Sequence, residues 1–93
     1  MSQYEITYIV RPLLEDPQVD EVASHFSEVA KQNGGEDIGA ERMGKRRLAY
    51  EIQKVREGHY VCMKFKGASA CADEVMRQMR LHENILRALV VRV

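Results

Sequence analysis

The stretch Gly44–Lys66, GKRRLAYEIQKVREGHYVCMKFK, holds two alternating runs of apolar and polar residues separated by a polar segment. Every second residue is apolar from position 48 to 52 and again from 61 to 65. A period of two is typical of β-strands, whose successive side chains point to opposite faces. The stretch therefore predicts a β-hairpin. Its first strand lies within Ile38–Ile52 and is interrupted or bent near Gly44. A turn follows at about Gln53–Gly58, and the second strand covers Tyr60–Lys66.

Two segments with helical periodicity flank this hairpin. Before it, Asp16-Pro17 predicts an N-cap followed by a proline at the first helical position, and Asn33-Gly34-Gly35 predicts the helix end. After it, Ser69 or a neighbour is expected to cap a second helix, which ends around His82–Asn84. In both segments apolar residues recur at spacings of three and four, which is the pattern of one buried helix face. The predicted buried residues are Val19, Val22, Ala23, Phe26, Val29 and Ala30, then Cys71, Ala72, Val75, Met76 and Met79.

The two ends of the chain complete the fold. Tyr4–Val10 is rich in β-branched and aromatic residues and stops at Arg11-Pro12, whereas Ile85–Val93 is a strand apolar enough to sit inside a sheet. The order β-α-β-β-α-β predicts an α+β, ferredoxin-like fold: a four-stranded antiparallel sheet with two helices on one face. Residues 1–93 are expected to form a single domain.

This arrangement leaves one face of the sheet without helices. Alternation assigns Val61, Met63 and Phe65 to the core, so Tyr60 and Cys62 are expected on the open face. Glu5 and Thr7 are expected beside them. The side on which Leu48, Tyr50 and Ile52 lie stays open, because a shift of one residue in the hairpin register exchanges the two faces.

The sequence carries few signs of catalysis. Its three histidines, His25, His59 and His82, lack the spacing of a metal motif, and Gly34-Gly35 follows a helix instead of opening one as phosphate-binding loops do. The loop that starts at Arg11 lacks the glycines that an acylphosphatase needs. We therefore expect no enzyme, metal site, cofactor or small-molecule substrate.

Bulk composition indicates an ordinary globular protein, with 45% hydrophobic and 30% charged residues. No apolar run approaches the roughly 18 residues of a membrane span, and the N-terminus does not resemble a signal peptide. A cytoplasmic protein without a membrane partner is the expectation. Cys62 and Cys71 lack paired spacing and are expected to be reduced thiols.

The net charge of zero hides a strong segregation of charge along the chain. Residues 1–41 contain nine acids and two cations, whereas residues 42–66 contain eight cations and two acids. Such a basic segment indicates a polyanionic partner. Tyr50, Tyr60 and His59 lie in the same segment and could stack on unpaired bases. The candidate RNA-binding residues are Arg42, Lys45, Arg46, Arg47, Lys54, Arg56, Arg80 and Arg87, with Arg92 as a further late cation.

The sequence motif of the hairpin is a more specific indicator of function than its charge. GKRRLAYEIQK followed by EGHYVCMKFK resembles the central hairpin of ribosomal protein six of the bacterial small subunit, the bS6 family. The resemblance extends to Tyr4-Glu5 and to Arg80 and Asn84, and so spans the chain, although Glu51 replaces a proline frequent in the family. The matching hairpin positions are Gly44, Arg46, Arg47, Leu48, Ala49, Tyr50, Ile52, Lys54, Gly58, Tyr60 and Phe65.

The resemblance implies a ferredoxin-like assembly protein without catalytic activity, located in the cytoplasmic ribosome. Its expected partners are the central domain of small-subunit ribosomal RNA and ribosomal protein eighteen, which it would join on the platform. Tyr4, Tyr50 and Tyr60 are then candidates for contact with the RNA or the partner protein. The alternative is a free-standing ferredoxin-like dimer that acts as a regulatory or ligand-binding module through its open sheet face.

Overall fold

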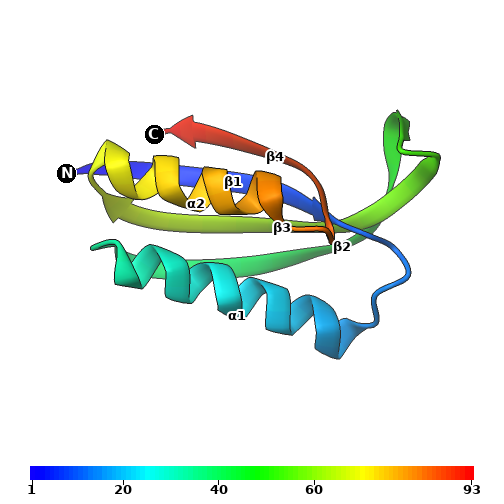
Figure 1. Cartoon of the computed structure of the whole chain (residues 1–93), viewed down its shortest axis with the longest axis horizontal. Helices are drawn as coiled ribbons and strands as arrows, with labels where there is room; N and C mark the ends of the chain where they lie inside the picture. Colours follow the sequence, from blue (N-terminus) through cyan, green and yellow to red (C-terminus); the bar gives the residue numbers. More distant parts are fainter.

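The computed structural model describes residues 1–93 as one antiparallel sheet with two helices packed on one of its faces (Figure 1). The strands lie in the order β2-β3-β1-β4, and every neighbouring pair is antiparallel. The predicted ferredoxin-like fold is confirmed. The elements are β1 (Ser2–Val10), α1 (Asp16–Gln32), β2 (Glu36–Ile52), β3 (Val55–Gly67), α2 (Ser69–Leu81) and β4 (Ile85–Arg92).

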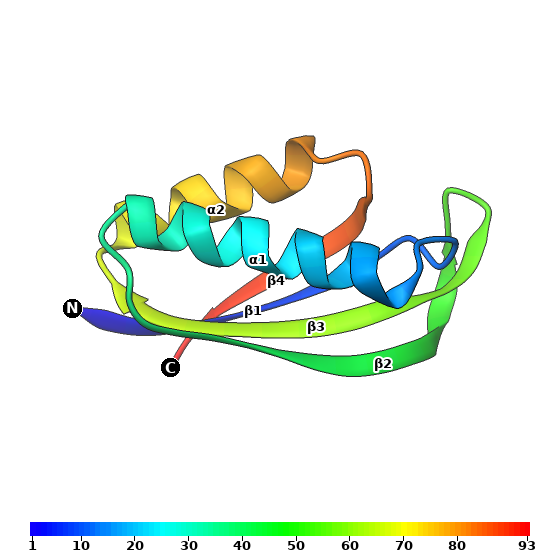
Figure 2. The same cartoon turned by 90° about the horizontal axis from the view of Figure 1, so that it is seen from below.

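The main core lies between the sheet and the two helices, which Figure 2 shows on the same side of all four strands. The two central strands β1 and β3 present alternate side chains to α1 and α2, as the period of two requires. The predicted core face of β3 is confirmed, because Val61, Met63 and Phe65 are at most 1% exposed. Each helix buries one stripe: Val19, Val22, Phe26, Val29 and Ala30 on α1, and Cys71, Ala72, Val75, Met76 and Met79 on α2.

The start of α1 differs by one residue from the prediction. Glu15, and not Asp16, is the N-cap of α1, and its backbone N–H donates to the Gln18 Oε1 at 2.8 Å. A glutamine three residues into a helix satisfies in this way a donor that has no partner inside the helix. The N-cap of α2 is Ala68, which agrees with the prediction of a cap at Ser69 or a neighbour.

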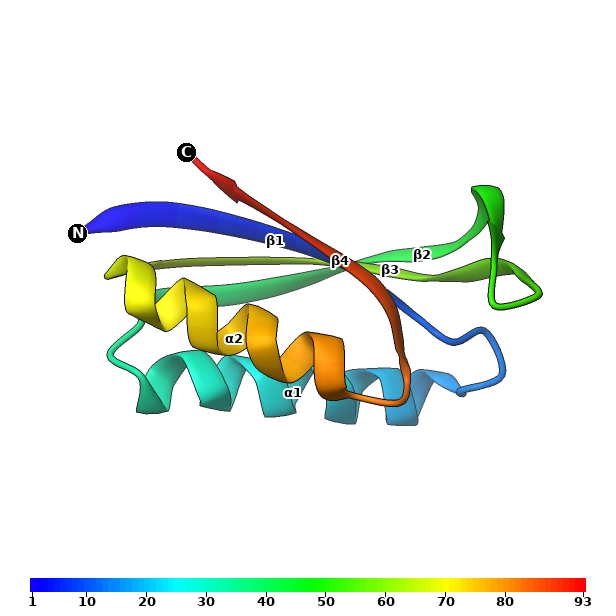
Figure 3. The ribbon, with the colours of Figure 1, turned by 45° about the horizontal axis from the view of Figure 1, so that its top comes forward.

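The β2–β3 hairpin is longer than predicted, because the turn is confined to Gln53 and Lys54. Both turn residues have positive φ, 50° and 65°, which is the backbone geometry of the tightest hairpin turns. Val55–Gly58, expected in the turn, therefore belongs to β3. The predicted bend near Gly44 is confirmed, since its φ of 89° coincides with a shift in the β2–β3 register. Figure 3 shows the hairpin reaching past the helices.

The last strand occupies a different place from the one expected. β4 pairs only with β1 and forms an edge of the sheet, so the prediction of an interior strand is wrong. Leu89, Val91 and Val93 are 60%, 51% and 69% exposed. The apolar pattern of this segment thus reflects an exposed surface as well as a buried one.

Candidate nucleic-acid interface

The open face of the sheet carries a second, smaller apolar cluster. Leu48 of β2, Ile9 of β1 and Leu86 of β4 are buried against one another on this face, although no helix covers them. Leu48, Tyr50 and Ile52 therefore lie on the open face, which settles the register left undecided by the sequence. We call this surface the sheet patch, and it borders an open hollow of about 280 Å³. It consists of Ile9, Leu48, Tyr50, Ile52, Tyr60, Leu86 and Leu89.

Two arginines flank the aromatic residues of the sheet patch. The guanidinium of Arg46 lies 6.0 Å from the centroid of the Tyr60 ring, and that of Arg87 lies 5.6 Å from the centroid of the Tyr50 ring. Cation–π contacts at this distance hold a guanidinium over a ring. Neither arginine has a carboxylate partner within 4.0 Å. Both guanidinium groups thus keep donors for an acceptor from outside the protein.

The hairpin end adds further cations. Arg47 and Lys54 are exposed and make no salt bridge, while Lys45 is 4.0 Å from a Glu57 carboxylate oxygen and Arg56 is 3.5 Å from one of Glu51. Exposed pairs at such distances contribute at most about 1 kcal/mol and exchange readily with other partners. The structure therefore brings most of the predicted basic residues to the hairpin end and its junction with β4.

Two of the predicted RNA-binding residues lie elsewhere. Arg42 points to the helix side, where Nη2 donates to Asp16 Oδ1 at 2.7 Å and Nη1 donates to Asp20 Oδ1 at 3.3 Å. This hydrogen bond and the charge of Arg42 lower the pKa of the Asp16 carboxyl. Arg80 lies in the last turn of α2, in the helix layer. Neither borders the sheet patch.

The aromatic candidates also divide. Tyr50, 57% exposed, and Tyr60 lie in the sheet patch, whereas Tyr4 is 7% exposed and packs against Phe65 with ring centroids 5.7 Å apart. His59 was predicted to be available for stacking, and this is wrong: it is 6% exposed, and its Nε2 lies 2.8 Å from the Leu14 carbonyl oxygen. The positions of Tyr4 and His59 in strand register turn both rings toward the helices.

Sequence reasoning missed two contributions to this region. The exposed apolar residues of β4, Leu89 and Val91, were hidden in an apolar run that indicates an interior strand. Arg11 braces the hairpin: its Nη2 donates to Gln53 Oε1 at 2.6 Å, and its Nε donates to the Glu83 carbonyl at 2.7 Å. Because Arg11 and Gln53 are 42 residues apart, no local sequence pattern predicts this contact.

Other kinds of site receive no support from the geometry. No group of three or more histidine, cysteine, aspartate or glutamate side chains is arranged to hold a metal ion. Cys71 is buried, and Cys62 lies half-buried on the open face as a free thiol. Neither helix has the length and hydropathy that crossing a membrane requires.

Comparisons with known proteins agree with one another. A family described as ribosomal protein S6 matches residues 3–92. The small ribosomal subunit protein bS6 of Desulforudis audaxviator is 44% identical and covers 99% of this chain and 98% of its own. The protein of the same description from Desulfitobacterium hafniense strain DCB-2 is 41% identical and covers 99% of this chain and 97% of its own.

The fold itself matches a solved structure. The crystal structure of 30S ribosomal protein S6 from Thermotoga maritima superposes with a TM-score of 0.91 at 26% sequence identity. The match covers 99% of this chain and 87% of that one.

Proposed function

This chain belongs to the ribosomal protein S6 family of the small ribosomal subunit, and from that membership we propose that it binds the central domain of small-subunit ribosomal RNA on the platform, together with ribosomal protein eighteen. The family consists of structural ribosomal proteins that are not enzymes, so the expectation of a non-catalytic protein is confirmed. Its place is in the cytoplasmic ribosome.

One observation carries the proposal: unpaired cations and an exposed apolar patch meet at one end of the open sheet face. Arg46 and Arg87 lie over the rings of Tyr60 and Tyr50, and Arg47 follows Arg46 in β2, opposite Glu57. Planar guanidinium groups suit phosphate oxygens, and the rings beneath these two hold them at the rim of the sheet patch. Such a surface fits RNA at its basic rim.

The apolar centre of the same surface fits a protein. Leu89, Val91 and Tyr50 are each more than half exposed, and Leu48 and Ile9 form a floor beneath this region. Apolar side chains gathered on one face of a sheet commonly mark an interaction site. A folded partner would cover them and release their hydration water. We therefore assign the sheet patch to ribosomal protein eighteen and the surrounding cations to the RNA.

Charge distribution favours a limited, oriented contact with RNA. Residues 1–41 are strongly acidic, and Arg42 is already paired with Asp16 and Asp20. These carboxylates repel phosphate and so favour RNA binding at the hairpin end. Phosphate contacts themselves carry no sequence information. Specificity then depends on RNA shape and on the partner protein.

A binding assay with a central-domain RNA fragment tests both the RNA contact and the contact with ribosomal protein eighteen. We expect weak binding by the protein alone and tighter binding when purified ribosomal protein eighteen is added. For about five phosphate contacts, the logarithm of affinity should fall with the logarithm of salt with a slope of about −3 to −4.5. A stable dimer without affinity for this RNA would contradict the proposal and favour the free-standing regulatory module.

The double variant Arg46→Ala, Arg47→Ala isolates the basic rim. We expect RNA affinity to fall about tenfold or more and the salt slope to become shallower by about two. Arg77→Ala is the matched control, because Arg77 is an exposed arginine on α2 whose guanidinium is held by Glu74 at 2.6 Å. Unchanged binding by the double variant would remove the hairpin from the RNA interface.

A further inference from the structure

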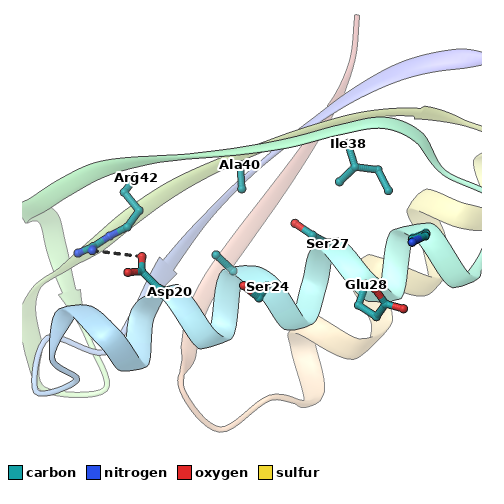
Figure 4. A pocket seen from close by; sticks show the side chains of 9 residues that line it. Asp20, Ser24, Ser27, Glu28, Ile38, Ala40 and Arg42 are labelled. Carbon is teal, nitrogen blue, oxygen red and sulfur yellow. Dashed lines mark hydrogen bonds and ion pairs between the residues drawn. The ribbon is translucent and has the colours of Figure 1, made fainter.

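A groove of about 500 Å³ runs between α1 and β2, on the face of the sheet opposite the sheet patch. Figure 4 shows Ile38, Ala40 and Arg42 pointing from the strand toward the helix, with Ser24 and Ser27 facing them. Ile38 is only partly buried and packs on the edge of the main core. The groove thus has an apolar floor and hydroxyl groups on its helix wall.

The strand that forms the groove has a free edge. β2 is the terminal strand of the sheet and pairs only with β3. The side chains of Ile38, Ala40 and Arg42, two residues apart, line the groove and span about 13 Å along the strand. An extended segment of about five residues laid along this edge could pair with the backbone of β2 and place alternate side chains in the groove.

The charge around this edge selects the kind of segment. Residues 16–42 contain seven acids and two cations. Arg42 is held by Asp16 and Asp20, whereas Glu28 in the groove wall and Glu41 on the strand have no basic partner. Lys31 lies at one end of the groove, and on the neighbouring β3 Lys64 and Lys66 are already paired with Glu5 and Asp37. Glu28 lies on the groove side of the sheet, whereas Glu41 pairs with Cys62 and lies on the other side. Cationic side chains on either face of an added strand would therefore meet an unpaired carboxylate.

We propose that the α1–β2 groove, together with the free edge of β2, binds an extended cationic segment of a partner protein as an added strand. The same carboxylates would repel the phosphate groups of a nucleic acid at this edge. They also oppose pairing with a second copy of the chain, since two β2 edges would bring carboxylates close together. This inference stands apart from the proposed function, because it concerns the other face of the sheet.

The test uses the full chain labelled with ¹⁵N and the capped peptide Lys-Val-Lys-Val-Lys-Val-Lys as probe. We expect amide shifts confined to Ile38–Arg42 and to the facing side of α1. Two control peptides, one with glutamate in place of lysine and one N-methylated at alternate residues, should cause no such shifts, because the first lacks charge complementarity and the second cannot pair as a strand.

Protein variants supply the second arm. Glu28→Lys combined with Glu41→Lys should weaken binding of the lysine peptide about tenfold, whereas Asp73→Lys, an exposed charge reversal on α2, should leave it unchanged. Shifts centred on Leu48 and Tyr50, equal binding of the N-methylated peptide, or equal affinity in the double variant would each overturn the proposal. So would groove shifts produced by a short RNA oligonucleotide, or self-association through β2 seen by sedimentation.

Discussion

Gly58 shows at the scale of one residue why the hairpin sequence matters. It is buried on the open face of β3, where a Cβ atom would overlap the Cγ2 methyl of Ile9 and lie 3.0 Å from the Val10 carbonyl oxygen. The two central strands thus approach so closely that only glycine fits. Gly39 on β2 provides the contrast, since a Cβ there would meet nothing within 4 Å.

We predict that Gly58→Ala lowers the free energy of unfolding by about 1–3 kcal/mol, the usual cost of an overpacked site. Gly39→Ala should change it by no more than about 0.5 kcal/mol. Urea titrations of the two variants beside the parent protein measure both values. Equal stability of all three proteins would show that Ile9 moves aside without cost.

At the scale of an element, the β2–β3 hairpin depends on a contact from outside itself. Its end extends beyond the helices (Figure 3), and its turn is held by the Arg11 guanidinium through Gln53. Arg11 is anchored in turn, because its Nε donates to the Glu83 carbonyl and its backbone N–H donates to the Asn84 carbonyl at 3.0 Å. One residue therefore fixes the hairpin end relative to the loop before β4.

We predict that Arg11→Ala loosens this end while the core stays intact. Amide hydrogen exchange at Val55 and Arg56 should accelerate roughly fivefold, which corresponds to about 1 kcal/mol of lost local stability. Amide exchange at Met63, in the centre of β3, should not accelerate to the same extent. Gln53→Ala should reproduce part of the effect, and an effect equal at both ends of the strand would indicate global destabilisation instead.

At the scale of the whole molecule, His82 joins the two helices at the start of the loop that leads to β4. Its ring centroid lies 5.5 Å from that of Phe26 and 6.1 Å from that of His25, both on α1. Burial, and secondarily the neighbouring His25, lowers the pKa of His82, while Glu83 opposes the shift. The folded protein therefore binds a proton at His82 less readily than the unfolded chain.

The sign of the pH effect follows from that difference. Stability contributed by neutral His82 is complete above the unfolded pKa of about 6.5 and is lost as the pH falls below it. We predict that His82→Gln reduces the loss of unfolding free energy between pH 7 and pH 5.5. The change in slope should stay well below about 1.4 kcal/mol per pH unit, because the ring is partly exposed. Parallel pH profiles of the two proteins from urea titrations would contradict this account.

Local patterns determined much of the fold. Periods of two and of three to four assigned the six elements in order, and alternation selected the core face of β3. Their errors were local as well: the turn at Gln53-Lys54 is tighter than its polar composition suggests, and the cap of α1 lies one residue early. Such patterns act over a few residues, which is why element type is predicted better than element ends.

The fold class, the basic character of the hairpin and the family motif can all be predicted from the sequence, because each depends on residues close together in the chain. Tertiary packing determines which cations are free of carboxylate partners. Arg42 is neutralised by Asp16, 26 residues away, while Arg87 from β4 reaches Tyr50 on the hairpin. It also placed His59 in the interior and β4 at an edge. Exposure and ion pairing depend on distances between segments remote in sequence, and those distances exist only after the sheet has formed.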